Sequence, residues 1–182
     1  DKIRKKKFID FSKKYIKETD KIYSIWESNS ELRSRFDKIV IGSDQVWNPS
    51  YNRLSGVFYG DFMNPVDIIS YAASFGVSEL SEEEIEFNKH YLSRIPNISV
   101  REKSASFLIN KLIGKRPIVV VDPTLLIDEH RWREIAIKKE NDKFILTYFL
   151  GEFPDNINKM LEDYEKKGFK VINILDKTDE SS

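Results

Sequence analysis

Short apolar runs alternate with longer amphipathic segments along this chain, a pattern typical of an α/β protein with parallel strands. Runs rich in β-branched residues, without polar alternation, indicate strands that are covered on both faces of a sheet. Of these runs, 118–121 has the clearest pattern of a buried strand. The predicted strands lie at 38–41, 67–72, 97–100, 118–121, 143–149 and 169–175.

Apolar residues at helical spacing, together with capping signatures, predict a helix before or between most of these strands. Ser28 with Glu31 and Ser81 with Glu84 both match the spacing of a capping box. The predicted helices are one over roughly 2–18, a short one beginning near Ser28, one from Ser81 that stops before Pro96, one containing 105–112 and closed by Gly114, a short one around Trp132, and one containing 157–164 and ended by Gly168.

The alternation restarts after a charge-rich stretch, which predicts two domains. We expect an N-terminal α/β domain over 1–127 that lacks its start, an interdomain passage over 128–142, and the first strand–helix–strand unit of a C-terminal Rossmann-like domain over 143–182. One such unit has an exposed sheet edge and buries little surface. Since the first residue is also not Met, we expect a chain that is truncated at both ends.

Charge and composition narrow the function classes. Thirty basic and thirty acidic side chains cancel, which argues against nucleic acid or an anionic membrane as the main partner. The chain has no cysteine, so disulfides and thiolate sites are excluded. No apolar run approaches the roughly 18 residues of a spanning helix, so we expect a cytoplasmic protein. His90 and His130 lack partners at metal-ligand spacing, and no metal site is expected.

Four polar clusters follow four predicted strands, and the carboxyl ends of parallel strands line one edge of a sheet. All four clusters therefore could face one crevice, although polar residues also follow strands simply because loops are wet. The clusters are Gly42-Ser43-Asp44-Gln45, Ser74-Phe75-Gly76, Arg101-Glu102 and Asp122-Pro123-Thr124.

Each candidate has a functional and a structural interpretation. The Arg101 guanidinium can present a planar fork to a carboxylate or phosphate, or it can pair with a neighbouring carboxylate such as Glu102 or Asp122. Asp44 can orient a sugar hydroxyl or act as a base, and Ser43 or Asp44 can equally cap the turn or helix that follows.

The remaining candidate residues also have both a functional and a structural interpretation. Ser74 and Gly76 can offer hydroxyl and N–H groups to an anion, or can form a turn. Asp122-Pro123 favours a rigid turn over direct chemistry. We expect Trp47 and Trp132 to pack against other residues instead of forming a surface on which a sugar ring stacks. The sequence contains neither a Walker loop nor a G-x-G-x-x-G motif.

The order of four motifs resembles the polysaccharide pyruvyl transferase family. The motifs are Asp37-x-Ile39-Val40-Ile41-Gly42-Ser43-Asp44-Gln45-Val46-Trp47-Asn48, Ile69-Ser70-Tyr71-Ala72-Ala73-Ser74-Phe75-Gly76, Ile98-Ser99-Val100-Arg101-Glu102 and Val121-Asp122-Pro123-Thr124-Leu125-Leu126. The resemblance implies a two-domain fold similar to GT-B glycosyltransferases. It also implies transfer of pyruvyl from phosphoenolpyruvate to sugar hydroxyls of a bacterial cell-envelope glycan or its lipid-linked precursor, which forms a ketal. No cofactor is implied, and the acceptor brings the protein close to a membrane.

The resemblance also assigns roles to residues. Arg101 matches a position that holds an anionic group of the donor, while Ser43, Asp44, Gln45, Ser74 and Gly76 match motifs that line the cleft. A His acting as general acid and a second Arg clamp are expected beyond Ser182, so we expect this piece alone to be inactive. Two alternatives stay open, namely a GT-B-like glycosyltransferase that uses a nucleotide sugar and a non-catalytic glycan-binding or scaffold member.

Overall fold

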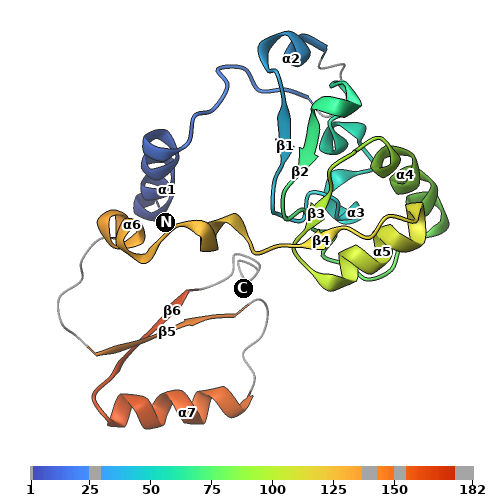
Figure 1. Cartoon of the computed structure of the whole chain (residues 1–182). Coiled ribbons are helices and arrows are strands. Elements are labelled where there is room, and N and C mark those ends of the chain that lie inside the picture. Colours follow the sequence, from blue (N-terminus) through green and yellow to red (C-terminus); the bar gives the residue numbers. More distant parts are fainter. Residues whose placement is uncertain (1, 25–29, 137–142, 150–154, 175–182) are drawn as a thin grey trace. The chain divides into compact units, whose positions relative to one another are not determined.

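A computed structural model of the chain describes residues 2–24, 30–136, 143–149 and 155–174 (Figure 1). The chain divides into two compact units, Asp1–Ile127 and Asp128–Ser182. Both units are mixed α/β structures with short parallel strands, which confirms the predicted fold class at that level. The capping box predicted at Ser28 lies outside the described residues.

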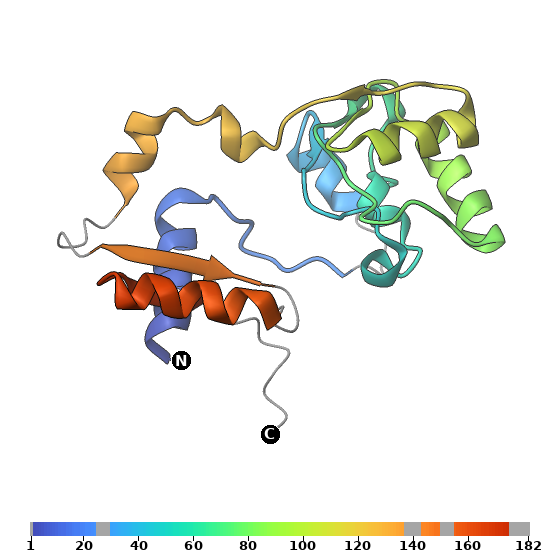
Figure 2. The same ribbon diagram turned by 90° about the horizontal axis from the view of Figure 1, so that it is seen from below.

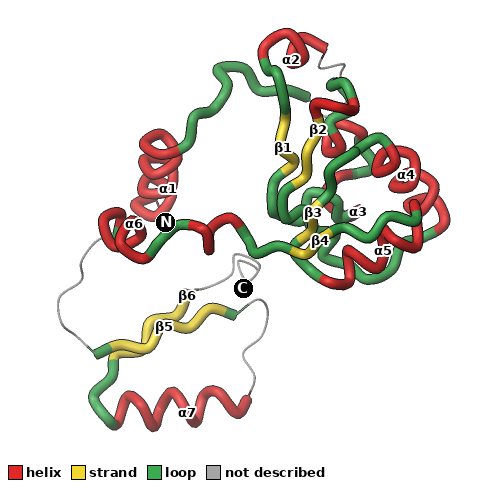
Figure 3. The backbone as a smooth tube through the Cα atoms, viewed as in Figure 1, coloured by secondary structure: helices red, strands yellow, loops and turns green. Residues whose placement is uncertain are grey.

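The described part of the first unit contains four short parallel strands, arranged as two pairs. β1 pairs with β2, and β3 pairs with β4. Two isolated parallel bridges, Ile69 to Asn97 and Ala73 to Val100, join the pairs into one row in sequence order. The strands are β1 (Ile39–Ile41), β2 (Ile68–Ser70), β3 (Ser99–Val100) and β4 (Ile118–Val119). Figure 3 shows how little of this unit is strand and how much is loop.

Two buried serines fasten β2 to β3. The Ser70 hydroxyl donates to the Ser99 carbonyl at 3.0 Å, and the Ser99 hydroxyl donates to the Ser70 carbonyl at 2.8 Å. Ser99 Oγ also accepts the N–H of Ala72 at 3.2 Å. Ala72 has a left-handed φ of 54° and is fully buried, so the chain turns sharply here. Beyond this turn, Ala73 bonds β3 directly.

The helices α4 (Glu82–Ser93) and α5 (Lys103–Ile113) lie side by side on the same side of these strands (Figures 1 and 2). The predicted capping box of Ser81 and Glu84 opens α4, and Gly114, at a φ of 70°, closes α5. The elements that precede them are α1 (Lys2–Tyr15), α2 (Ser30–Arg35), α3 (Pro49–Asn52), and the 3-10 turns Gly56–Tyr59 and Pro65–Asp67.

The core of the first unit gathers aromatic side chains under α4. Trp47 is fully buried and stacks on Tyr59 with ring centroids 5.7 Å apart, while the Phe75 ring is tilted against the indole at 5.5 Å. The Trp47 indole N–H donates to the Phe58 carbonyl at 3.3 Å. This arrangement confirms that Trp47 is a packing residue.

Two predictions about strand burial are wrong. Val40, in the middle of β1, is 63% exposed, and Ile118, in the strand expected to be the most buried, is 69% exposed. β4 lies at the end of the described row of strands, and α4 and α5 cover the other face of the sheet. Apolar composition alone did not distinguish a strand covered on one face from a strand covered on both.

The described residues of the second unit form one parallel strand pair and two helices. β5 (Phe144–Tyr148) pairs with β6 (Lys170–Ile174), and α7 (Asp155–Lys166) connects them and lies along the pair (Figures 1 and 2). α6 (Glu129–Ile135) precedes them and carries Trp132. Gly168, at a φ of 83°, follows α7, as expected, whereas the predicted turn at 151–154 lies outside the described residues. No helix in the described ranges is long and apolar enough to cross a membrane.

Candidate functional site

The carboxyl ends of the four parallel strands in the first unit bring the four predicted clusters together. Backbone bonds tie the first two loops. The Trp47 N–H donates to the Ser74 carbonyl at 3.1 Å, and the Ser74 N–H donates to the Asp44 carbonyl at 3.3 Å. The Arg101 N–H donates to the Ala73 carbonyl at 3.2 Å, so the third cluster is fixed to the second.

Arg101 stands between two carboxylates. Its Nη1 donates to Oδ2 of Asp122 at 3.3 Å, and its Nε lies 3.9 Å from Oε2 of Glu102. These are the two partners considered from the sequence as the structural alternative. The side chain nevertheless remains 33% exposed, while the two carboxylates hold the orientation of its guanidinium.

Asp122 is held as an anion by several donors. The N–H and hydroxyl of Thr124 donate to its Oδ1 at 3.0 and 2.7 Å. Together with hydrogen bonds from Ser43 and Arg101, these contacts lower the pKa of Asp122 from 3.8 to about 2. Asp122 also caps the 3-10 turn Pro123–Leu126, which confirms the predicted turn. Through Ser43 it joins the loop after β1 to the loop after β4.

Glu102 organises the loop after β2. Its Oε1 accepts the Ser74 hydroxyl at 2.9 Å and the Phe75 N–H at 3.2 Å. Ser74 is buried, and its oxygen accepts the Gly76 N–H at 3.1 Å. The Ser74 proton is therefore engaged by a carboxylate. Sequence reasoning missed this role of Glu102, and the only available signal was a carboxylate following a strand next to the strand of Ser74.

Gly76 permits a close approach to the loop after β1. Its φ is +65°, and a Cβ built there would lie 2.1 Å from Oε1 of Gln45. The same Gln45 oxygen accepts Nδ2 of Asn48 at 2.7 Å. Asn48 also caps α3 by accepting the Ser50 N–H at 3.0 Å. Of the two possibilities for a cap at Ser43 or Asp44, a helix cap is not found for α3, because Asn48 supplies its cap and Pro49 its first helical residue.

The Asp44 carboxylate stands apart from this network. It is exposed, and its Oδ1 accepts the N–H of the next residue, Gln45, at 2.7 Å. The structure thus links the side chains of Ser43, Arg101 and Ser74 through carboxylates and brings Gln45 against Gly76. It leaves the Asp44 side chain facing solvent.

The two histidines lie elsewhere. His90 is exposed on α4, and Nδ1 of His130 lies 3.5 Å from Glu134 within α6. Across the described ranges, no three His, Asp or Glu side chains are grouped in a way that would hold a metal ion.

In this cluster the Arg101 guanidinium is the cation, and carboxylates surround it. A guanidinium oriented by Asp122 and Glu102 can donate a fork to an incoming anion, but that anion competes with two resident carboxylates. A doubly charged ligand therefore requires more positive charge than this cluster has. The carboxylate of Asp44 can accept a hydrogen bond from a hydroxyl without such competition.

Comparison with known proteins gives one match. A family model described as polysaccharide pyruvyl transferase matches residues 1–179. No curated protein and no solved structure matches the chain significantly.

Proposed function

Because the chain belongs to the polysaccharide pyruvyl transferase family, we propose that it contributes to transfer of the pyruvyl unit of phosphoenolpyruvate to two hydroxyls of a sugar. The acceptor is a cell-surface polysaccharide or its precursor, and the product is a cyclic ketal. The reaction takes place in the cytoplasm, where the donor is made.

The reaction needs an acid and an acceptor for protons. A proton added to the methylene carbon of the donor turns it into a methyl group and leaves an oxocarbenium-like carbon, which the first sugar oxygen attacks. Phosphate then leaves, and the second sugar oxygen bonds to the same carbon. Of the two hydroxyl protons, one balances the proton of the new methyl group and the other leaves with phosphate.

Arg101 is the residue on which this proposal rests. It follows a strand in the motif shared with the family, two carboxylates fix its orientation, and one third of it remains open to solvent. A planar fork in this state suits the carboxylate or phosphate of the donor. The exposed Asp44 carboxylate suits a sugar hydroxyl, and Gly76, Gln45 and Ser74 shape the loops beside it.

The remaining charge and the general acid belong to other parts of the enzyme. We propose a GT-B-like pair of domains, in which the units Asp1–Ile127 and Asp128–Ser182 belong to different domains. A His acid and a second Arg clamp complete the site.

Ligand-induced stabilisation and phosphate release on the intact enzyme test this proposal. Phosphoenolpyruvate at 100 times its Kd should stabilise the folded enzyme by about 2.7 kcal/mol and raise its melting temperature. Arg101→Lys keeps the charge but loses the fork, so we expect phosphate release to fall at least about tenfold. Arg33→Lys, on exposed α2, is the matched control and should keep full activity.

The outcomes discriminate between enzyme classes. Stabilisation by a nucleoside-diphosphate sugar, with none by phosphoenolpyruvate, would instead identify a glycosyltransferase. Unchanged phosphate release in Arg101→Lys and Arg101→Ala would remove Arg101 from donor binding. Intact function in the cell after Arg101→Ala would favour a non-catalytic scaffold.

A further inference from the structure

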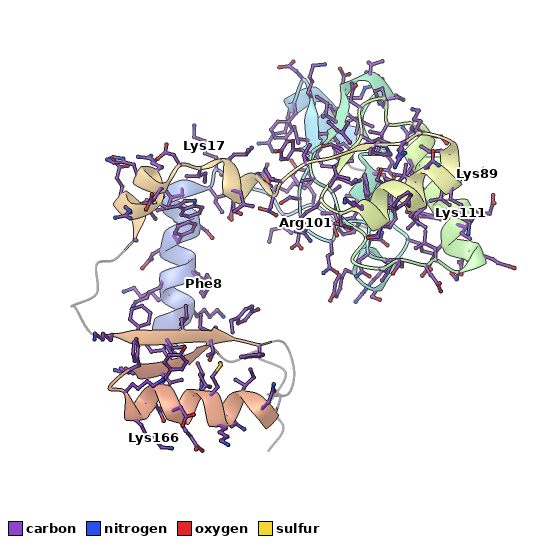
Figure 4. The ribbon with its side chains drawn as sticks, turned by 60° about the horizontal axis from the view of Figure 1, so that its bottom comes forward. Phe8, Lys17, Lys89, Arg101, Lys111 and Lys166 are labelled. Carbon is purple, nitrogen blue, oxygen red and sulfur yellow. The ribbon has the colours of Figure 1, made fainter. Side chains whose placement is uncertain are left out.

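Two carboxylates hold Arg101, and they hold it in different ways. Nη1 of Arg101 donates to Oδ2 of Asp122 at 3.3 Å, whereas Oε2 of Glu102 lies 3.9 Å from Nε, beyond hydrogen-bonding distance. Among the described residues, none accepts a hydrogen bond from Nη2. Figure 4 shows Arg101 at the end of the first unit away from Lys89 and Lys111, so these lysines do not reach its carboxylates. Asp122 therefore occupies one half of the end of the guanidinium, and Glu102 attracts the group without accepting an N–H.

The Glu102 carboxylate is fixed in place by buried partners. Its Oε1 accepts the hydroxyl of Ser74 at 2.9 Å and the N–H of Phe75 at 3.2 Å, and both of these residues are buried. Glu102 is also the N-cap residue of α5, yet its side chain makes no capping hydrogen bond, so the carboxylate serves the loop and not the helix. Moving it would leave a buried hydroxyl and a buried N–H without their acceptor, which is costly.

The Asp122 carboxylate, in contrast, can release Arg101 and keep its other partners. The N–H and hydroxyl of Thr124 donate to Oδ1 at 3.0 and 2.7 Å. These two bonds do most to lower the pKa of Asp122, the hydrogen bond from Ser43 does less, and the one from Arg101 does least. The 3.3 Å bond to Arg101 is also longer than is usual between charged groups. Losing it would therefore leave the carboxylate hydrogen-bonded and in contact with water.

We propose that Asp122 is a counterion that the substrate anion displaces from Arg101, whereas Glu102 is a positioning residue that stays in place. The incoming carboxylate or phosphate accepts from Nη1 and Nη2 together, which is a fork end-on to the guanidinium. Asp122 then keeps only its bonds from Thr124 and Ser43. This inference rests on the proposed function for the identity of the anion, while the competition itself requires only that Arg101 binds anions.

The displacement has a consequence for specificity. An anion reaches Nη1 only during the fraction of time in which Asp122 has released it, so the apparent affinity is reduced by that fraction. An anion that contacts Arg101 alone is therefore bound weakly. A substrate with a second anionic group, which another part of the enzyme can bind, is favoured over it.

Titration calorimetry of the intact enzyme tests the displacement, with phosphoenolpyruvate and inorganic phosphate as separate ligands and no acceptor sugar present. Asp122→Asn keeps an oxygen for Thr124 but no longer pairs with Arg101. The Kd for each anion should therefore fall about fivefold. Asp122→Ser keeps a hydroxyl that can cap the turn Pro123–Leu126 and should lower both Kd values in the same direction, which covers the case of an Asn variant that misfolds.

Glu102→Gln separates position from charge. Like Asp122→Asn, it removes one negative charge beside Arg101, so a purely electrostatic effect would tighten anion binding in both variants. Its amide oxygen can still accept from Ser74, but its N–H groups then face Nε and the guanidinium loses its orientation. We expect the Kd for both anions to rise about threefold or more. Opposite changes in Kd for these two variants are not expected from a merely structural role.

Asp67→Asn is the matched control. Asp67 pairs with Lys38 at 3.4 Å, its side chain is 25% exposed, as that of Asp122 is, and it precedes β2, at the opposite end of the strands. This variant should leave both Kd values unchanged. Arg101→Ala should abolish the binding of inorganic phosphate, which shows that the titration reports on this guanidinium.

The outcomes distinguish this inference from the proposed function. Equal tightening by Asp122→Asn and Glu102→Gln would assign the effect to net charge and overturn the displacement. An unchanged or raised Kd in both Asp122 variants would overturn it too, as would anion binding that survives Arg101→Ala or a wild-type enzyme that binds neither anion. If phosphate shows the expected pattern and phosphoenolpyruvate does not bind, the displacement holds and the proposed function is wrong. If phosphoenolpyruvate binds without the pattern, the proposed function stands and the displacement is wrong.

Discussion

The two units use the same parallel strand–helix–strand arrangement, but they bury very different amounts of it. In the first unit, Trp47, Tyr59 and Phe75 form a contiguous buried core with residues of the strands and of α4 and α5. Among the described residues of the second unit, Leu161 on α7 is the only buried side chain. The arrangement of strands is therefore not what distinguishes a stable unit from a marginal one.

The first unit is more stable than the second because its helices, strands and loops are packed more tightly. The first unit has two helices on one side of four strands, and its loops fold inward to fill the remaining space. Its site inherits that rigidity, since the Arg101 backbone and the loop at Ser74 are both bonded to the sheet. We therefore expect the first unit to unfold globally and the second to open at lower free energy.

The largest difference in stability between the two units should appear when the buried Trp47 side chain is removed. Trp47→Ala deletes the fully buried indole and should cost about 3–5 kcal/mol, whereas Leu161→Ala in the second unit should cost about 2 kcal/mol. Hydrogen exchange measures both changes: in Trp47→Ala, the amides of β1 to β4 should exchange faster while those of β5 and β6 do not. Equal costs for the two variants would show that the units are equally packed.

Two glycines, one in each unit, have similar backbone conformations but different surroundings, so they test how tightly each unit is packed. Gly76→Ala should cost about 2 kcal/mol or more, because its φ is positive and its Cβ would overlap Gln45. Gly168→Ala has the same strain but open space, and it should cost about 1 kcal/mol. Urea unfolding provides the comparison. A Gly76→Ala protein as stable as Gly168→Ala would mean that the Gln45 loop moves aside freely.

Cross-strand side-chain pairs provide a third comparison. Ser99→Ala leaves the buried Ala72 N–H without its acceptor and should cost about 1–2 kcal/mol. Thr147 instead donates from its hydroxyl to the Asn173 side chain across β5 and β6, on an exposed surface. Thr147→Ala should therefore change the free energy of unfolding by no more than about 0.5 kcal/mol. A larger loss there would place the second unit's strand pair under tighter constraint than its burial suggests.

The smallest effect should depend on pH. The pKa of Asp122 falls from 3.8 to about 2 on folding, so its ionised form stabilises the first unit above pH 4. This contribution is lost as the pH falls from about 4 to 2, through the folded-state pKa. The urea midpoints of wild type and Asp122→Asn should therefore differ at neutral pH and converge in this window. A difference independent of pH would assign the effect to geometry instead of charge.

Local chemistry in this chain was predictable, and distant contacts were not. The capping box at Ser81 and the end of α5 at Gly114 depend on neighbouring residues, and both were predicted. The burial of Ile118 depends on what covers the sheet, which no local pattern contains. The ordering of strand ends predicted that Ser43, Ser74, Arg101 and Asp122 would meet.

The sequence did not predict which partner each side chain would have. Arg101 was expected either to bind a ligand or to pair with a carboxylate, and the structure has it doing the second while still partly exposed. The bond from Ser74 to Glu102 joins residues 28 positions apart. Only the register of β2 against β3 determines that contact, and register is set by the whole sheet.

The exposed outer strand of the first unit also matters for solubility. Ile118, Val119 and Val121 form an apolar segment whose open edge could template pairing with another unfolded chain. Pro117 and Pro123 stand on either side of it, and Lys115 and Arg116 precede it. Such gatekeepers limit aggregation by removing donors and adding charge. We expect expression yield to be most sensitive to substitutions at these four positions.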